Sequence, residues 1–324
     1  MLSCIECGSS FYFYDDKVVC QKKHEFPVKN NVPEILPNNY ASDLKKTASI
    51  YGKLWRKDVE NLNYESSLDW HLKEVQKVLP FQIVKGKVGL EIGCGYGLDS
   101  ITMAQDNPNT HIFSVDLSEG VFLAEKLKHN LKNISFIRAS ATKLPFRDNT
   151  FDFVYSYGVL HHVPNSLEGF CEMVRVLKPR ARFFLYLYED HRDHFIKYYP
   201  LKLISFLRRL STQLKPKNLE LLSIIMSPFI VLFFSWPSRI LSKLPFTQDL
   251  AKKIPFNFGK GLFSLRGDLY DRFAAPYEHR FHKQQLIDIF TKLHCEDLFF
   301  TKLEKSAGWV VSGGKEIWGR HDKI

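Results

Sequence analysis

Four residues near the N-terminus have the types and spacing of metal ligands. Two residues separate Cys4 from Cys7, three separate Cys20 from His24, and twelve lie between the pairs. Zinc prefers four thiolate or imidazole ligands in a tetrahedron, and a two-residue gap lets paired thiolates face one ion. A segment this short buries too little apolar surface to fold unaided, so the metal would supply the missing stability. We therefore expect a zinc ribbon, against the alternative of a chance cluster.

A second group joins an acid to three glycines and a later acid: Glu91, Gly93, Gly95, Gly97 and Asp116. Each acid belongs to a short apolar stretch typical of a strand. Glycine lets the backbone approach a ligand closely, because it has no Cβ atom. A carboxylate at the end of the next strand commonly holds the ribose hydroxyls of a nucleoside. The spacing predicts a nucleotide-like cofactor at about residues 91–116.

Strands and helices that alternate over residues 86–190 would position this second group. The strands are almost continuously apolar, which is typical of a parallel sheet buried on both faces. Two late strands, near 296–302 and 308–312, complete a seven-stranded sheet. The predicted fold class is therefore α/β, with a mostly parallel Rossmann-like sheet. Ligands of such sheets bind at the carboxyl ends of the strands.

Several motifs of this segment resemble those of the class I S-adenosylmethionine-dependent methyltransferases. They are Glu91-Ile-Gly-Cys-Gly-Tyr-Gly97, Asp116, Leu144-Pro-Phe-Arg-Asp-Asn-Thr-Phe-Asp152, Gly158-Val-Leu-His-His-Val-Pro164 and Leu177-Lys-Pro179. The resemblance implies S-adenosylmethionine as cofactor and methyl transfer as activity. It implies a cofactor site at Glu91, Gly93, Cys94, Gly95, Gly97, Asp116, Leu117, Ser140, Ala141, Thr142 and Ser156. The sequence departs from the family at Ser140, where an acid is common near the adenine, and at Arg180-Ala181, where two glycines are usual.

The cysteine-rich segment is similar to the zinc ribbon of the bacterial 23S ribosomal RNA guanine-N1 methyltransferases. The similarity covers the paired ligands and the Phe26-Pro-Val stretch that follows them. It implies Cys4, Cys7, Cys20 and His24 as zinc ligands. Pro27, Pro33 and Pro37 disfavour helix, so residues 26–37 are predicted to be an extended linker.

A hydroxyl acceptor must lose a proton during methyl transfer, and histidine suits that task because its pKa lies near neutrality. His161 and His162 follow the fourth strand and are our candidate bases; Tyr157 is a further candidate. Tyr277, His279 and Arg280 form a second polar cluster that would serve the substrate. For each histidine the alternative is a packed or turn-capping role.

Residues 191–275 interrupt the alternating pattern with a basic, leucine-rich and aromatic insertion. Segment 191–262 holds twelve Lys/Arg and three acids, a net +9 of the chain's +10. Its most apolar run, Leu219–Trp236, carries Glu220 and is predicted to break at Pro228. It would then fall short of the ~20 residues of a membrane span. A helix in the plane of an anionic membrane surface and a packed cap both fit this pattern.

These observations predict five segments: a ribbon with linker (1–37), a helical flank of the cofactor cleft (38–85), the cofactor-binding core (86–190), the insertion (191–275) and the end of the core (276–324). The N-terminus lacks the pattern of a signal peptide, and the cysteine usage suits a reducing compartment, so we expect a cytoplasmic protein, associated or not with the inner face of the membrane. Three functions stay open: a methyltransferase for a small-molecule or lipid-linked acceptor, an RNA methyltransferase, and a non-catalytic scaffold.

Overall fold

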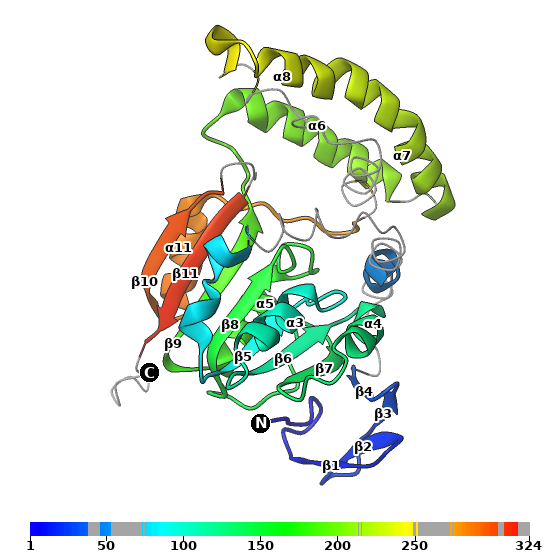
Figure 1. The fold of residues 1–324 in the computed structure, drawn as a ribbon, viewed down its shortest axis with the longest axis vertical. Coiled ribbons are helices and arrows are strands. Elements are labelled where there is room, and N and C mark those ends of the chain that lie inside the picture. The colour runs from blue at the N-terminus through cyan, green and yellow to red at the C-terminus, as the bar shows by residue number, and fades with distance from the viewer. Residues whose placement is uncertain are drawn as a thin grey trace. The chain divides into compact units, whose positions relative to one another are not determined.

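The structure of the chain is a computed structural model (Figure 1). It describes residues 1–37, 46–52, 73, 75–212, 214, 216–248, 251, 273, 275–303 and 308–316. The chain forms two compact units, Met1–Glu189 with Tyr277–Ile324, and Asp190–Pro276. Most of the helical flank expected over 38–85 lies outside the described residues. Of that segment the structure describes helical pieces at 46–52 and 75–78 and the short 3-10 helix η1, Phe81–Val84.

One sheet organises the first unit, with strand order β1-β2-β3-β4-β7-β6-β5-β8-β9-β11-β10. Seven of its described strands form the core: β5 Val88–Ile92, β6 His111–Asp116, β7 Ile134–Ala139, β8 Phe151–Tyr157, β9 Leu177–Tyr188, β10 Cys295–Thr301 and β11 Gly308–Lys315. Strands β7, β6, β5, β8 and β9 are parallel. Strand β11 is antiparallel to β9 and to β10. The predicted seven-stranded, mostly parallel sheet is confirmed.

Both faces of this sheet are buried, as its continuous apolar strands predict. Along β8, Val154 joins one hydrophobic cluster, whereas Phe153 and Tyr155 join the other. Successive side chains of a strand point to opposite faces, so the two clusters lie on opposite sides of the sheet. The rim at the strands' carboxyl ends is thereby held between two packed layers.

Helices alternate with the core strands of the first unit, as the pattern over residues 86–190 predicts. They are α3 Leu98–Asp106, α4 Gly120–Leu127, α5 Ser166–Val176 and α11 Lys283–Lys292. Helix α5 begins at Ser166, where the Asn165 side chain accepts hydrogen bonds from the amides of Leu167 and Glu168. An asparagine at that position satisfies amides that have no partner inside the helix.

The N-terminal segment contributes four strands: β1 Phe11–Phe13, β2 Lys17–Cys20, β3 Glu25–Lys29 and β4 Val32–Ile35. Strands β1 and β2 pair as an antiparallel hairpin. The extended linker predicted over residues 26–37 is not present, because β3 and β4 pair with each other around Asn30 and Asn31, whose φ angles are 51° and 64°. Asparagine tolerates positive φ, which a tight hairpin turn requires. Strand β4 then pairs in parallel with β7 and so joins the ribbon to the core sheet.

The second unit is helical over the part that the structure describes. Its elements are α6 Phe195–Ser211, α7 Pro216–Ile230, the π-helical turn η2 Val231–Ser235, α8 Trp236–Leu241 and the 3-10 turn η3 Pro245–Thr247. Elements α7, η2 and α8 follow one another without a gap. They make one long helix, which Figure 1 shows curving through the labels α7 and α8.

The prediction that Pro228 breaks the apolar run was wrong. Proline has no N–H to donate to the carbonyl four residues earlier, which belongs to Ile224. The Ser227 hydroxyl donates to that carbonyl at 3.0 Å, and the π turn follows directly. The helix thus continues through Pro228. By length and composition alone, its 21 residues Leu221–Leu241, with a mean hydropathy of 1.8, suffice to cross a membrane.

Candidate functional site

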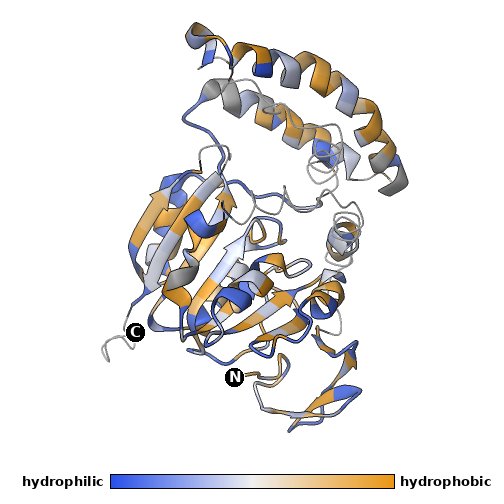
Figure 2. Ribbon diagram, viewed as in Figure 1, coloured by the Kyte–Doolittle hydropathy of each residue, from blue (hydrophilic) through white to orange (hydrophobic). Residues whose placement is uncertain are grey.

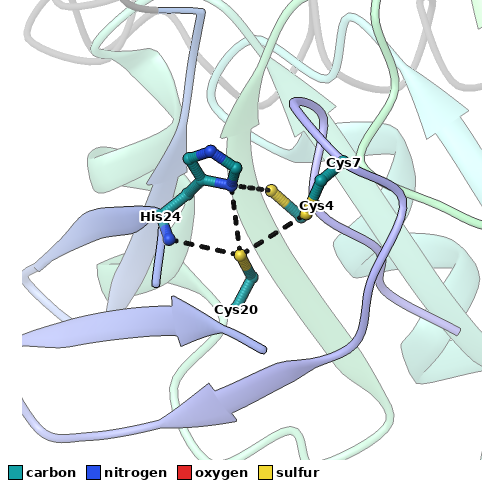
Figure 3. A group of neighbouring side chains, drawn as sticks. All are labelled: Cys4, Cys7, Cys20 and His24. Atoms are coloured by element: carbon teal, nitrogen blue, oxygen red, sulfur yellow. Dashed lines mark hydrogen bonds between the residues drawn. The ribbon is translucent and has the colours of Figure 1, made fainter. Parts of the chain in front are cut away.

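Figure 3 shows the four expected metal ligands gathered around one space. Their ligand atoms all lie within 4.8 Å of one another. The Nδ1 atom of His24 is 3.6 Å from the Cys4 sulfur and 3.3 Å from the Cys20 sulfur, and Cys7 and Cys20 are 3.6 Å apart, sulfur to sulfur. A zinc tetrahedron with ~2.3 Å bonds to sulfur has edges of about 3.8 Å. The donor set and its spacing therefore fit a zinc-sized ion.

Local backbone turns hold the two ligand pairs. The Gly8 amide donates to the Cys4 carbonyl at 2.8 Å, and Gly8 has a φ of 72° that favours glycine. Burial raises the pKa of the Cys4 thiol to about 11. Against the effect of burial, hydrogen bonds from Ser9 and from the His24 backbone lower the pKa of Cys20 to about 6. A bound dication would deprotonate the remaining thiols as well.

The glycine-rich loop joins β5 to α3 with left-handed backbone at three positions. The φ angles of Gly93, Gly95 and Gly97 are 83°, 56° and 82°. A Cβ atom at Gly93 would lie 2.2 Å from the side chain of Val159, and one at Gly97 would lie 2.7 Å from that of Ala124. Only glycine fits these two positions, which explains the spacing of the motif.

Asp116 organises this loop from the end of β6. Its carboxylate accepts hydrogen bonds from the Gly95 amide at 2.8 Å and from the Ser118 amide at 2.7 Å. Burial raises the pKa of Asp116, and these amides together with Arg138 oppose that rise. A carboxylate oxygen carries more than one lone pair, so the group retains acceptor capacity for a ligand's hydroxyls.

Two further acids lie beneath the loop. Glu91, at 3% exposed, accepts a hydrogen bond from the Ser100 hydroxyl, and Asp99, at 6% exposed, accepts one from the Tyr155 hydroxyl at 3.1 Å. Burial raises the pKa of Glu91 well above its usual range, and the negative charges of Asp99 and Asp116 raise it further. The carboxyl groups of Glu91, Asp99 and Asp116 thus create a negative potential in the low-dielectric interior beneath the loop, and this potential favours a cationic ligand.

The other expected cofactor residues line the same rim with varied contacts. Ser140 is buried, and its hydroxyl lies 2.9 Å from the Thr142 hydroxyl. The Leu117 carbonyl accepts a hydrogen bond from Arg138. The Ser156 hydroxyl donates to the Ile92 carbonyl at the end of β5. Cys94 is buried, which raises the pKa of its thiol well above the usual range. Contact of these residues and of Ala141 with a cofactor stays a prediction.

His161 and His162 lie side by side after β8, with ring centroids 4.3 Å apart. His161 is fully buried, and the centroid of its ring lies 3.9 Å from that of the Tyr188 ring. Burial, then the nearby charges of His162, Arg280 and His279, lower its pKa well below the usual range. The His162 Nδ1 atom is 2.8 Å from the Tyr277 carbonyl oxygen. Because a carbonyl only accepts, Nδ1 carries the proton, and in the neutral ring the lone pair belongs to Nε2.

The segment around Tyr277 packs against these histidines. His279 donates to the carbonyls of Val163 and Pro164, and its amide donates to the His161 carbonyl at 2.8 Å. The Arg280 guanidinium contacts Glu278 at 2.7 Å and the Glu189 carbonyl at 3.1 Å. The structure therefore brings the second polar cluster beside the first. These contacts anchor the segment, and a substrate role for Tyr277, His279 and Arg280 stays a prediction.

Comparison with known proteins decides the class of the core. Residues 90–185 match the family model described as a methyltransferase domain. This segment is a class I, S-adenosylmethionine-dependent methyltransferase domain. It contains the glycine loop, Asp116 and both histidines, as the sequence motifs predicted.

Bacterial relatives match the same part of the chain. The demethylmenaquinone methyltransferase of Listeria welshimeri is 36% identical over 122 residues, which cover 36% of this chain and 50% of that protein. The enzyme of the same name from a Geobacillus species is 30% identical over 148 residues, covering 44% and 63%. Among solved structures, magnesium protoporphyrin IX methyltransferase from Synechocystis is 13% identical with a TM-score of 0.47, covering 84% of this chain and 97% of that one. The chain thus spans about half the length of the first of these relatives.

The residues present fit the cofactor that this family implies. S-Adenosylmethionine carries a sulfonium and an ammonium group, and both would offset the negative charge gathered at Glu91, Asp99 and Asp116. The missing Cβ atoms at Gly93 and Gly97 let the loop backbone pack directly against Val159 and Ala124, which fixes the loop beside these carboxylates. Both observations concern this chain's own residues, and they agree with the motif.

Sequence reasoning missed the polar residues that support the loop. Asp99 and Ser100 start α3, Ser114 lies in β6 with its hydroxyl 2.5 Å from that of Ser100, and Tyr155 lies in β8. A signal was available for Asp99, because an acid in the first turn of a helix that follows a glycine loop is favoured by the helix dipole. No comparable local signal marks Ser114 or Tyr155, which reach the loop only through the sheet.

Proposed function

We propose that this chain is an S-adenosylmethionine-dependent methyltransferase (EC 2.1.1) acting on a small-molecule or lipid-linked acceptor. One observation carries the proposal: the loop 93–97, with two positions that only glycine fits, lies beside the buried carboxylates of Glu91 and Asp99 and the half-buried carboxylate of Asp116 in a methyltransferase domain. The relatives support a small acceptor, because their names give demethylmenaquinone as the molecule methylated.

In this proposal Asp116 binds the ribose hydroxyls and Glu91, with Asp99 behind it, faces the methionine part. The loop amides and Ser140 with Thr142 border the remainder of the cofactor. When bound, the sulfonium supplies an electrophilic methyl group and a neutral thioether leaving group. The protein's contribution is to hold the acceptor in line, to exclude water and to remove a proton where the acceptor is a hydroxyl.

His162 is the better candidate for proton removal. Its Nδ1 proton is held by the Tyr277 carbonyl, which fixes the ring and leaves Nε2 as the basic atom. A base oriented by a third group is a recurring arrangement in catalysis. His161, fully buried against Tyr188, acts in this proposal as a neutral packing partner that positions His162.

We further propose that the Cys4–His24 cluster binds zinc and that the ion is structural. Its four protein ligands complete a tetrahedron and leave no position for a substrate, unlike catalytic zinc, which keeps one open. The ribbon is tied to the domain by the amide of Ser3, which donates to the Pro145 carbonyl, and by the ion pair between Arg138 and Glu34. Binding of RNA would be the alternative function of such a ribbon.

Transfer of a radiolabelled methyl group from S-adenosylmethionine to total cell extract tests the function. After incubation the extract is separated into small molecules, lipids, RNA and protein, with Asp116→Ala as the matched variant. We expect label in the small-molecule or lipid fraction, and its loss with the variant. Label confined to RNA would show that the acceptor is RNA and not a small molecule or lipid. No transfer to any fraction, together with cofactor binding by the wild type, would favour the non-catalytic scaffold.

A further inference from the structure

Large apolar side chains cover the outer surface of the long helix α7-η2-α8. Ten of them are at least 36% exposed, including Leu221, Ile225, Phe229, Leu232, Phe233 and Trp236, each more than half exposed. Figure 2 shows the hydrophobic colour along most of this helix. Soluble proteins rarely expose apolar patches beyond a few hundred Å², and larger ones mark an interaction surface. This helix therefore needs an apolar partner.

Among the described side chains of this helix, the buried ones are mostly serines, with Leu219 and Ile230 as the exceptions. Ser223, Ser227, Ser235 and Ser238 are all at most 6% exposed. A surface helix of a soluble protein has the opposite pattern, with apolar residues inside and polar residues outside. Helices in membranes bury small residues such as serine and present large apolar residues to lipid. The distribution along α7-η2-α8 follows the membrane pattern.

The buried residues of α7-η2-α8 form a stripe along the helix, and the π turn keeps this buried stripe on one face. Buried positions run at three- or four-residue spacing up to Ile230, then jump five residues to Ser235 across η2. A π turn holds more residues than an α-helical turn, so the longer step returns to the same face. The stripe is therefore continuous despite Pro228.

The polar groups of the helix are satisfied within the chain. The Ser227 hydroxyl bonds the Ile224 carbonyl that Pro228 leaves without an amide, and the Ser238 hydroxyl donates to the Ala251 carbonyl at 3.1 Å. Hydrocarbon offers no hydrogen bonds, so a helix enters it only when its backbone groups are paired internally. This requirement is met at Pro228, one of the two prolines of the long helix.

Charges lie at the two ends of the apolar stretch. No charged residue occurs from Leu221 to Ser238, a length of about 27 Å at 1.5 Å per residue. Lys217 and Glu220 precede this stretch, Arg239 and Lys243 follow it, and the segment 191–262 carries twelve basic residues against three acids. Anionic phospholipid headgroups complement such a basic border.

We propose that α7-η2-α8 embeds its exposed apolar surface in the hydrocarbon of a bilayer containing anionic lipid, with Arg239 and Lys243 at the headgroups. A cap, in which this surface would be buried against the first unit, is the alternative that vesicle binding tests. A second copy of the chain would cover the same surface, but the excess of positive charge on both copies opposes that pairing. The inference does not depend on methyl transfer, and its test needs no cofactor.

Flotation of the full chain with vesicles tests the proposal. The vesicles contain phosphatidylcholine with or without phosphatidylglycerol. The test variant is Leu221→Ser with Ile225→Ser, Phe229→Ser and Phe233→Ser, all at exposed positions that leave the buried stripe intact. The control variant changes two exposed apolar residues of the first unit, Leu167→Ser with Phe299→Ser. We expect the wild type and the control to float with anionic vesicles and the test variant to lose about a hundredfold or more in partitioning.

Two further measurements remove the alternatives. Molar salt shortens the screening length to about 3 Å, so a purely electrostatic contact would release the protein, whereas an embedded helix stays bound. Lipids brominated in their acyl chains should quench wild-type fluorescence, and Trp236→Phe should abolish that quenching. Release by salt, absence of quenching, or flotation of the test variant equal to the control would each overturn the proposal. A concentration-dependent dimer in light scattering, lost in the test variant and without flotation of the wild type, would assign the surface to a second copy.

Discussion

The Cys4–His24 cluster and the glycine loop both gather anionic groups around space for a cation, but they assemble them differently. The cluster takes its ligands from two local turns within residues 4–24, and the loop takes its carboxylates from β5, α3 and β6. The turns that carry the cluster are expected to depend on the ion, because so short a segment buries little apolar surface of its own, although Val18, Phe26 and Ile35 pack into the core. The loop is held by a packed sheet whether or not a ligand is present. Metal loss should thus unfold the first region, and cofactor loss should leave the second intact.

The largest effect is expected from removing two metal ligands. Cys4→Ser with Cys7→Ser should abolish metal binding and expose the amides of β1 and β2, because structural zinc contributes roughly 10 kcal/mol or more to the folding of small metal domains. Metal analysis and amide hydrogen exchange measure both outcomes. Cys171→Ser, an exposed cysteine outside the cluster, is the control. A wild-type protein that contains no metal would refute the assignment.

The next largest effect concerns the charge of Asp116. Asp116→Asn keeps an oxygen that accepts one loop amide but loses the charge, so cofactor affinity should fall by about ten- to a hundredfold. Isothermal titration calorimetry measures the affinity, and thermal unfolding should show a folded protein. Asp106→Asn, at the end of α3 and away from the loop, is a matched control. Affinity equal to wild type would remove Asp116 from the cofactor site.

The smallest and most diagnostic effect concerns Glu91. Its pKa is raised in the folded protein, so the stability linked to its protonation is fully present below pH 4.5 and is lost as the pH rises through the raised pKa. Glu91→Gln removes this titration, and its thermal stability relative to wild type should increase with pH. Cofactor affinity should show the reverse: the wild type should bind more tightly as the pH rises and Glu91 ionises, and the variant should respond less. Identical pH profiles for the two proteins would contradict the role of Glu91.

The difference between the two regions also explains what sequence could predict. The metal ligands lie within 21 residues of one another, and the glycines are required by one local turn. Each group therefore has a regular spacing that a single sequence shows, so the cluster and the loop were both predicted. Ser114 and Tyr155 support the loop from strands that neighbour it only in the folded sheet, and their spacing from Glu91 carries no local signal. The π turn that accommodates Pro228 likewise depends on the Ser227 hydroxyl, so a rule that treats proline as a helix breaker gave the wrong boundary.

The linker prediction failed for a related reason. The prolines of residues 26–37 exclude helix, which was correct, but they do not exclude a strand at the margin of a sheet. The turn at Asn30 and Asn31 reverses the chain and brings β4 against β7. Strand pairing of this kind is decided by tertiary contacts, whereas the local pattern reports only that the chain is extended.

The pairing of β4 with β7 has a consequence for solubility. Without β4, the core sheet would end at β7 and present a row of unpaired amides and carbonyls, which invites another chain to add a strand. Residues 34 and 35 occupy that margin, and the ion pair of Glu34 with Arg138 holds them there. A chain whose ribbon has lost its metal would uncover the margin. The ion would then protect the methyltransferase domain from self-association into aggregates, in addition to folding the ribbon.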